Sequence, residues 1–448
     1  MRSWKVIFAE SLYAEMHKYL FSNSPNENGC FLLANHYNAG RYNSVLIVTK
    51  IIRPDPNNWQ YADDSSLAPT SEFINRAVIE ADSSGLCPLF VHTHPGPHHP
   101  LSFSSVDRST NVRLFQNLDE ILSPRPLGSI VISSEGVSGV VFSNGRLEDI
   151  TQVKVIGSSL KAVHLQRLNS ASNILDSKFD RQVRMYGEKN QELIQSLTVS
   201  IVGLGGTGSS VAIQLARMGV RKLLLIDKDT IEDTNLTRVY GSTIADIGRP
   251  KVEVIKKHIR SFSRDTKVKT LRRDVTKEDV TDELIQSDII FGCTDNLSSR
   301  AIMNDVAIQY YIPLIDIGCR IHKLPDGRID QMLAKIQVVT PDTACLWCTE
   351  TLDGVAIMQE TLTDNERKKL ELEGYGENTD KQPSIISLTS MAASLGVHKF
   401  LQMLTDPTIE STTQVELVNS FFINDSPKIK QECVCQKRRG VAGLRRII

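Results

Sequence analysis

Residues 200–251 read SIVGLGGTGSSVAIQLARMGVRKLLLIDKDTIEDTNLTRVYGSTIADIGRPK. A short apolar run leads into a glycine-rich loop, whose glycines are Gly203, Gly205, Gly206 and Gly208. Apolar residues then recur at three- and four-residue spacing over 211–218, which is typical of a helix with one buried face. A second apolar run, 223–226, ends at Asp227 and Asp229. The order strand, glycine loop, helix, strand predicts a nucleotide-binding unit.

The chemistry of this unit follows from its residue types. Glycines let the backbone turn tightly and approach a phosphate, and the start of a helix offers free N–H groups and a positive dipole to the anion. The acidic residue that follows the second strand, Asp227, can accept a hydrogen bond from a ribose hydroxyl. The glycines and the acidic residue alone do not distinguish a dinucleotide from another nucleotide.

The residues after the second strand favour a triphosphate instead. Asp227 and Asp229 begin the pattern Asp-x-Asp-x5-Asn-x2-Arg, which continues through Asn235 and Arg238, and the sequence GRPK then ends at Lys251. A dinucleotide site needs no arginine and lysine at these positions. A triphosphate that loses pyrophosphate does, because fixed cations stabilise the charge that develops on the leaving oxygens.

Two further motifs accompany this one. Residues 179–187 read FDRQVRMYG and residues 292–296 read GCTDN. Together the motifs, over about residues 173–400, resemble the ThiF/MoeB and ubiquitin-activating enzyme family, which adenylates the C-terminal glycine of a ubiquitin-like protein. The resemblance implies that ATP and Mg²⁺ are bound and that Arg181 acts as an arginine finger on the ATP of a partner subunit. It also implies that Asp295 holds Mg²⁺ or the adenylate; an alternative for Asp295 is a helix N-cap.

The composition of the 448-residue chain indicates two or three domains. A net charge of −1 argues against a dedicated nucleic-acid binder. No run of about 18 apolar residues is present, so no membrane span is predicted. The first residues lack the apolar core of a signal peptide, and the eight cysteines of a long chain favour thiols and metal over disulfides. We therefore expect a cytoplasmic protein that binds neither nucleic acid nor membrane.

Residues 1–150 are expected to form a first domain with a mixed sheet and helices. Strand-like runs occur at 44–52, 89–92 and 129–142, the last with a predicted turn at 136–139, and 72–81 looks helical. Side chains alternate along a strand, so two histidines one residue apart at a strand end point the same way. His92 and His94 have this spacing, and Asp107 follows a loop later. Two histidines, a carboxylate and an open position are typical of catalytic zinc.

The segment HTHP with the later Ser104 and Asp107 is similar to the JAB/JAMM (MPN) metalloprotease motif, His-x-His-Pro-xn-Ser-x2-Asp. The resemblance implies that His92, His94 and Asp107 ligate Zn²⁺ and that Glu27 is the general base for the water that the metal activates. It implies that Ser104 hydrogen-bonds the tetrahedral oxyanion. The loop before Ser104 is about two residues longer than the motif leads us to expect, so Ser102 is an alternative. A JAMM fold without catalytic activity is the alternative for the whole domain.

Residues 151–172 are interpreted as a connecting segment, and residues 173–448 as the adenylation domain. Helical patterns at 252–262, 277–286 and 298–310 alternate with apolar strands at 268–271, 289–291 and 312–317. Such alternation predicts a parallel sheet covered on both faces. The predicted fold class is therefore α/β: a mixed-sheet α+β JAMM domain followed by a Rossmann-like, doubly wound, mostly parallel sheet. Residues 362–382 are expected to form a crossover loop.

Four cysteines are spaced for a second metal. Cys345 and Cys348 form Cys-x2-Cys, and Cys433 and Cys435 form Cys-x-Cys. Four thiolates make a closed structural zinc site; a pair of reduced thiols, or redox chemistry, is the alternative. Ubiquitin-activating relatives of this type carry a thioester cysteine after the first pair, but residues 349–432 contain no cysteine. Either the reaction ends at the acyl-adenylate, the interpretation that we favour, or another residue such as Cys319 substitutes.

These patterns predict a bifunctional enzyme of a ubiquitin-like modifier pathway. The C-terminal domain is expected to adenylate the terminal glycine of a ubiquitin-like or sulfur-carrier protein. The N-terminal domain is expected to hydrolyse a peptide or isopeptide bond at that tail, for maturation or deconjugation. One complete set of motifs per chain predicts a homodimer, and a conjugating enzyme is a further candidate partner. The alternatives are activation of a peptide or small acid, sulfur transfer, and an inactive scaffold.

Overall fold

The computed structural model describes residues 3–22, 25–64, 66–95, 103, 105–133, 136–163, 176–362, 366, 383–405 and 410–443. The chain divides into two compact units. The first comprises residues 1–173 with 309–311 and 439–443, and the second comprises the remainder. In the part of the chain that the structure describes, no helix is both long and apolar enough to cross a bilayer.

The first unit is built on one mixed sheet with strand order β1-β3-β2-β6-β7-β8-β9-β10. β1 also pairs with β9, so the ladder of seven strands returns to its starting strand. The β1–β3, β1–β9 and β6–β7 pairs are parallel and the other pairs are antiparallel. The elements are β1 (Ser3–Ala9), α1 (Glu10–Leu20), β2 (Gly29–Asn38), β3 (Asn43–Ile52), β4 (Trp59–Ala62), β5 (Leu67–Pro69), α2 (Ser71–Ser84), β6 (Cys87–His94), α3 (Ser105–Leu122), β7 (Leu127–Ser133), β8 (Gly136–Ser143), β9 (Arg146–Ile156) and β10 (Leu160–Val163).

Two details of this unit differ from expectation. β9 and β10 continue the sheet to residue 163, so the segment expected to connect the domains from residue 151 begins inside the sheet. The glycines predicted to form a turn, Gly136 and Gly139, lie in β8 instead. Gly139 is required there by packing, because a Cβ would come within 2.5 Å of the Ile150 side chain on β9.

The second unit contains an eight-stranded sheet with order β13-β12-β11-β14-β15-β16-β17-β18. The strands from β13 to β15 are parallel, and β15 to β18 are antiparallel. The parallel half is therefore the Rossmann-like sheet that the alternation predicted, and the antiparallel half was not predicted. The strands are β11 (Thr198–Val202), β12 (Lys222–Ile226), β13 (Lys267–Leu271), β14 (Ile289–Gly292), β15 (Leu314–Lys323), β16 (Ile329–Val339), β17 (Thr412–Glu416) and β18 (Phe421–Asp425).

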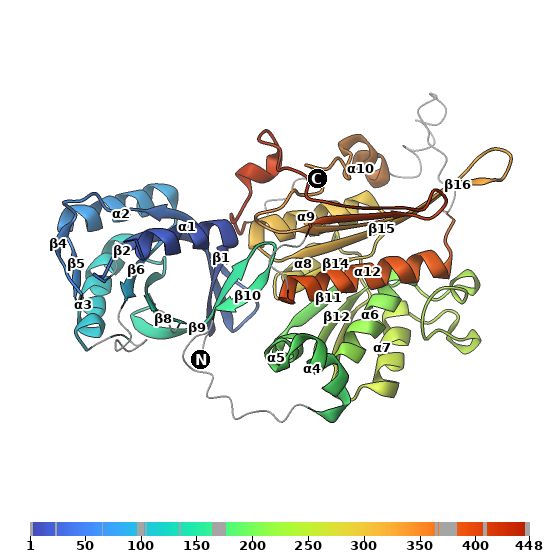
Figure 1. The fold of residues 1–448 in the computed structure, drawn as a ribbon, viewed down its shortest axis with the longest axis horizontal. Helices are drawn as coiled ribbons and strands as arrows, with labels where there is room; N and C mark the ends of the chain where they lie inside the picture. The colour runs from blue at the N-terminus through green and yellow to red at the C-terminus, as the bar shows by residue number, and fades with distance from the viewer. Residues whose placement is uncertain are drawn as a thin grey trace. The chain divides into compact units, whose positions relative to one another are not determined.

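Helices cover both faces of this sheet. α6 and α12 lie side by side with α7 on one face, and α8 and α9 lie on the other (Figure 1). β11 pairs with both β12 and β14, so the chain winds outward in opposite directions from β11, which is the switch point where nucleotides bind in such folds. The helices are α4 (Asp180–Tyr186), α5 (Glu188–Ser196), α6 (Gly206–Met218), α7 (Lys251–Phe262), α8 (Glu278–Leu284), α9 (Leu297–Tyr310), α10 (Gly354–Thr361) and α12 (Ile386–Thr405).

Two predicted segments fall largely where the chain is not described. Residues 164–172 of the predicted connecting segment, residues 173–175 after it, and most of the predicted crossover segment, 362–382, lie outside the described residues.

Candidate functional site

The glycine loop follows β11 at the switch point of the second sheet. Gly203 has φ of +86°, and a Cβ there would come within 2.7 Å of the carbonyl oxygen of Cys293, which follows β14. A Cβ on Gly208 would come within 1.8 Å of the carbonyl oxygen of Gly203. Only glycine can therefore bring the loop, the start of α6 and the end of β14 together. By contrast, among the described residues no atom is found within 4 Å of the Cβ position of Gly205.

Asp227 holds the loop in place. Its Oδ2 accepts a hydrogen bond from the N–H of Leu204 at 2.6 Å, and its Oδ1 accepts one from the N–H of Asp229 at 2.8 Å. Burial raises the pKa of this carboxyl, while Lys251 and the two N–H groups act in the opposite direction. Asp227 was predicted to bind ribose; the structure adds a second role, because the carboxylate fixes the backbone of the glycine loop.

The two predicted cations lie near the loop. Lys251, at the start of α7, is 9% exposed and its Nζ lies 2.9 Å from Oδ2 of Asp229. The Arg238 guanidinium donates to the carbonyl oxygen of Thr234 at 2.8 Å, and the Cβ of Arg238 is 3.4 Å from the Cβ position of Gly206. Both cations are therefore anchored beside the loop before any nucleotide is bound.

Asn235 has a structural bond that the sequence pattern did not indicate. It is 5% exposed, and its Oδ1 accepts the N–H of Glu232 at 3.2 Å, which caps a single 3-10 turn. This turn leads directly to Arg238. Asn235 thus shapes the segment that carries the arginine, and its predicted contact with nucleotide stays a prediction.

Asp295 is exposed at the end of β14, and the neighbouring Asn296 caps α9 by accepting the N–H of Ser299 at 2.8 Å. The N-cap alternative considered for Asp295 is therefore filled by Asn296, which leaves the Asp295 carboxylate available for a cation. Glu360 of α10 also binds the start of α9, accepting the N–H groups of Leu297 and Ser298 at 2.8 Å.

The middle of α9 is joined to the cysteine-rich segment. Oδ1 of Asn304 accepts the buried N–H of Leu346 at 2.8 Å. The Arg438 guanidinium lies 2.8 Å from Oδ2 of Asp305, and both side chains are largely buried. Arg181, the predicted arginine finger, lies on the exposed surface of α4.

One polar cluster in this unit was not predicted from the sequence. Arg300 of α9, Asp316 of β15 and Lys335 of β16 gather at the carboxyl end of β14, beside the first half of β15. Burial raises the pKa of the Asp316 carboxyl and lowers the pKa of the Lys335 ammonium, and each group opposes the shift of the other. A charged residue inside the otherwise apolar strand pattern of 312–317 was the signal that could have identified it.

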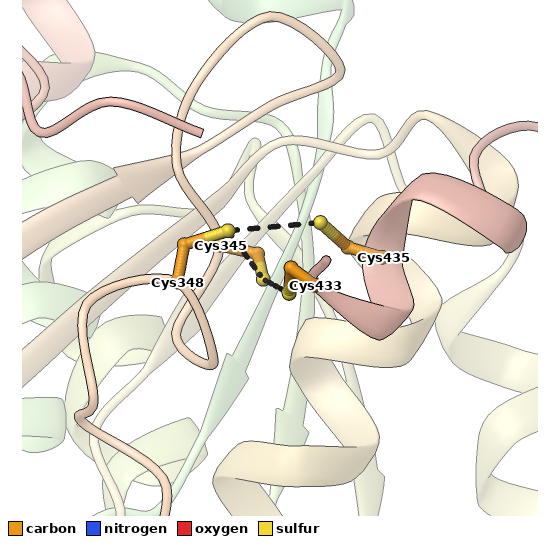
Figure 2. A group of neighbouring side chains, drawn as sticks. All are labelled: Cys345, Cys348, Cys433 and Cys435. Carbon is orange, nitrogen blue, oxygen red and sulfur yellow. Dashed lines mark hydrogen bonds between the residues drawn. The ribbon is translucent and has the colours of Figure 1, made fainter. Parts of the chain in front are cut away.

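The four predicted cysteines converge, as Figure 2 shows, with the sulfur atoms pointing toward one another. Cys345 and Cys348 come from a loop, and Cys433 and Cys435 come from the start of a 3-10 turn. The Sγ–Sγ distances are 3.7 Å for Cys345–Cys348, 3.6 Å for Cys345–Cys433 and 3.7 Å for Cys348–Cys435. A zinc ion with about 2.3 Å bonds in tetrahedral geometry would give sulfur separations of about 3.8 Å, so the four residues fit Zn²⁺.

The predicted histidine and carboxylate group also assembles. Nε2 of His92 lies 3.9 Å from Oδ1 of Asp107, and Nε2 of His94 lies 4.0 Å from Oδ2 of Asp107. One ligand atom from each residue lies within 4.8 Å of the others. His92 is 4% exposed, and within the described residues neither of its ring nitrogens has a hydrogen-bond partner. Buried nitrogens without partners fit a metal ligand.

Glu27 reaches this group through strand register. Gly29 of β2 pairs with His92 of β6 in antiparallel register, so Glu27 lies opposite His94, and its Oε1 is 3.8 Å from Nε2 of His94. Glu27 is 4% exposed, and its pKa is raised to about 7 by burial and by the charges of Asp107 and nearby aspartates. Ser104 and its alternative Ser102 lie outside the described residues.

The thiols near the nucleotide loop are not activated. The pKa of the Cys319 thiol is raised to about 11, chiefly by desolvation. Burial likewise raises the pKa of Cys293. Both groups are therefore protonated at neutral pH, and a protonated thiol is a poor nucleophile.

The nucleotide end of the second unit has known relatives. The model of the ThiF family matches residues 179–440. The sulfur carrier protein ThiS adenylyltransferase of Escherichia coli K12 is 35% identical over 125 residues, which covers 28% of this chain and 49% of that protein. The SAMP-activating enzyme E1 of Haloferax volcanii is 29% identical over 173 residues, covering 38% of this chain and 60% of that protein. The matched stretches thus span about half of the length of these relatives.

Among solved structures, E. coli MccB with MccA-N7isoASN is similar to this chain with a TM-score of 0.48 and 20% identity. The similarity covers 60% of this chain and 75% of that one. The family match begins at residue 179, so it does not extend to the group formed by His92, His94 and Asp107.

Proposed function

This chain belongs to the ThiF family through residues 179–440, and we propose that this part adenylates the C-terminal glycine of a ubiquitin-like or sulfur-carrier protein. The observation that carries the proposal is the glycine loop at the switch point, with Lys251 and Arg238 anchored beside it. The names of two similar proteins, a ThiS adenylyltransferase and a SAMP-activating E1, support the class of reaction and of substrate.

In the proposed reaction a carboxylate oxygen of the terminal glycine attacks the α-phosphorus of ATP. The bond between the α-phosphorus and its bridging oxygen breaks, and pyrophosphate leaves with the electron pair. Lys251 and Arg238 stabilise the negative charge that develops on the phosphates. The pairing of Lys251 with Asp229 orients the ammonium group before ATP binds, which reduces the cost of reorganisation in the transition state.

The remaining motif residues would bind the nucleotide and its metal. Gly203, Gly205, Gly206 and Gly208 would let the backbone approach the phosphates, and Asp227 would accept a ribose hydroxyl while it holds Leu204. Asp295 would hold Mg²⁺, which supplies charge neutralisation on the phosphates. Arg181 would act on the ATP of a second copy, so we propose a homodimer in which each site is completed across the interface.

We propose that the reaction of this chain ends at the acyl-adenylate. No cysteine occurs between residues 349 and 432, and the raised pKa of the Cys319 thiol argues against its use as the nucleophile. The activated glycine would pass to a thiol or sulfur donor outside this chain.

For the first unit we propose a zinc peptidase or isopeptidase that acts at the tail of the same modifier. His92, His94 and Asp107 would hold the ion, and the unpartnered nitrogens of His92 support this assignment. Bound zinc lowers the pKa of water to about 7 and polarises a carbonyl. The Glu27 carboxylate would take a proton from water and deliver it to the leaving amine. The four cysteines would hold a structural zinc ion.

ATP–pyrophosphate exchange tests the proposal. The purified chain is incubated with ATP, Mg²⁺, labelled pyrophosphate and a small protein that ends in Gly-Gly. We expect exchange only when that protein is present, with loss of exchange when its last glycine is removed. Exchange without the protein would favour activation of a small acid. Absence of exchange with several carriers, together with less than one zinc per chain, would favour a scaffold.

A further inference from the structure

Arg300, Asp316 and Lys335 form a charged cluster on the polar face of β15 and β16. Asp316 and Gly318 of β15 lie opposite Gln337 and Lys335 of β16. The alternate residues of β15 face α12, as Ile317 does, because a Cβ on Gly396 would meet it at 2.3 Å. The cluster is therefore built on the face that α12 does not cover.

The guanidinium of Arg300 uses little of its bonding capacity. Nε donates to the carbonyl oxygen of Thr294 at 3.3 Å and lies 3.6 Å from Oδ1 of Asp316. Neither Nη atom has a hydrogen-bond partner among the residues that the structure describes. The group passes over Gly318, where a Cβ would come within 2.8 Å of Nη2. Its side chain is only 15% exposed, so four N–H donors are held in a largely buried place without acceptors.

Asp316 does not accept a hydrogen bond from the Nη groups of Arg300. It is 3% exposed, and its Oδ1 has no hydrogen bond within the described part of the chain. A buried ion pair with such loose geometry does not recover the cost of removing its charges from water. Lys335 adds a second cation, whose Nζ donates to Oγ1 of Thr351 at 2.8 Å. Asp425 of β18 also acts on Lys335, so the positive charge left without a close acceptor lies on the Nη groups of Arg300, where an added anion would fit.

The cluster lies next to the nucleotide loop. Thr294, which accepts from Arg300, places its methyl group 3.1 Å from the Cβ position of Gly203, and its buried hydroxyl has no partner among the described residues. On the other side the segment 344–351 covers the same face, because Gln337 bonds Ala344 and Thr349. Arg300 is thus held between the glycine loop and this covering segment.

Lys251, one of the proposed phosphate cations, lies on the opposite side of the switch point. Lys251 pairs with Asp229, which follows β12, whereas Asp316 is on β15. In the strand order β12-β11-β14-β15 these two positions are three strand spacings apart, or about 14 Å. An anion at Arg300 therefore lies apart from the phosphate that Lys251 would bind, which suits the carboxylate that reacts with the nucleotide.

We propose that Arg300 binds the terminal carboxylate of the acyl substrate and that Asp316 is a positioning residue for its guanidinium. The inference rests on the proposed function and identifies the residue that receives the glycine tail. The planar fork of an arginine matches both oxygens of a carboxylate. The tail enters from the β15 side, beneath segment 344–351, and its carboxylate reaches the α-phosphate from the side away from Lys251.

Calorimetric titration tests this with a synthetic decapeptide that ends in Gly-Gly, prepared with a free carboxylate and as the C-terminal amide. We expect the wild-type chain to bind the acid at least about tenfold more tightly than the amide, because charge-assisted bonds to Arg300 need the carboxylate. Arg300→Ala should remove this preference, Arg300→Lys should restore part of it, and Asp316→Asn should weaken it. Arg320→Ala is the matched control and should behave as wild type, because Arg320 is an exposed arginine on β15, the strand that carries Asp316.

A parallel titration with Mg·ATP separates the two anions. Arg300→Ala should change the Kd of ATP less than twofold, while Lys251→Ala should raise it about tenfold or more. A loss of ATP affinity in Arg300→Ala would overturn the proposal in favour of a phosphate site. Equal binding of acid and amide by the wild-type chain would overturn it as well, whatever the exchange assay gives. If the acid is preferred but no exchange occurs, the carboxylate site stands and the proposed adenylation falls.

Discussion

Lys251 is anchored before substrate arrives, since its ammonium lies 2.9 Å from the Asp229 carboxylate and is nearly buried. We expect Lys251→Ala to lower kcat of pyrophosphate exchange about 100-fold, because a fixed cation on the phosphates is lost. Lys256→Ala is the matched control, since it removes a lysine from the next turn of the same helix, paired with Glu253 and away from Asp229. Exchange that falls equally in both variants would contradict the role of Lys251.

Glu27 is expected to separate metal binding from catalysis in the first unit. Glu27→Gln keeps the size of the side chain beside His94 but cannot accept the proton, so cleavage of a modifier tail should fall about 100-fold or more. Zinc content measured by atomic emission should stay at the wild-type value, because Glu27 is not proposed as a ligand. Cleavage at the wild-type rate would remove Glu27 from the mechanism.

At the scale of elements, two glycines at the junction of β11 and α6 are expected to have different roles: Gly208 is needed for packing, and Gly205 for contact with the nucleotide. A Cβ on Gly208 would overlap the carbonyl oxygen of Gly203 at 1.8 Å, so Gly208→Ala should lower stability by about 3 kcal/mol. This corresponds to a fall in Tm of roughly 6 °C or more. Gly205→Ala should leave Tm unchanged, since its Cβ would meet no atom of the residues that the structure describes, yet weaken ATP binding about tenfold. Differential scanning calorimetry and ATP titration measure the two effects, and an equal Tm for both variants would contradict this assignment.

The elements also show what sequence patterns could predict. The glycine loop, α6 and the parallel strands follow from local rules, because buried parallel strands are apolar throughout and amphipathic helices repeat every three to four residues. The antiparallel strands β16 to β18 were not predicted. β17 (TTQVE) is mostly polar, and β16 mixes polar with apolar residues without a regular period. The apolar run of β18, Phe421 to Ile423, is only three residues long and exposed, so it does not mark a buried strand.

The candidate sites were predicted unevenly for a similar reason. His92, His94 and the four cysteines are rare residue types at characteristic spacing, so their assembly could be expected from sequence. Asn296 as the α9 cap and Arg300 as an unsatisfied cation could not, because polar residues of these types occur throughout the chain. Their roles depend on which backbone group or carboxylate the fold brings near, as with Asp316.

For the whole molecule, zinc content should reveal two independent centres. The wild-type chain should contain two zinc ions, and Cys435→Ser and His92→Ala should each lose one. Cys435→Ser should also lower Tm, because a closed thiolate site contributes to folding, whereas pyrophosphate exchange should persist in His92→Ala. Loss of both ions in either variant would contradict the independence of the sites.

Subunit mixing tests the proposed dimer. Arg181→Ala and Lys251→Ala should each be inactive alone in exchange. If each site needs Arg181 from one copy and Lys251 from the other, mixing equal amounts should recover about a quarter of wild-type activity, because half of the dimers are mixed and one of their two sites is complete. A variant with both substitutions on one chain, mixed with wild type, should not exceed the activity of the wild-type dimers that remain. No recovery after subunit exchange would exclude catalysis across an interface.

Helix α9 contacts residues near both the proposed nucleotide site and the cysteine cluster. Asn296 and Glu360 hold its first turn beside Asp295, while Asn304 and Asp305, in the middle of the helix, bind the N–H of Leu346 and the guanidinium of Arg438. One rigid helix therefore joins, over about 12 Å of its axis, the proposed nucleotide site and the proposed zinc site. Occupancy of one site should raise affinity at the other by reciprocal linkage, so ATP should slow the loss of zinc to a chelator.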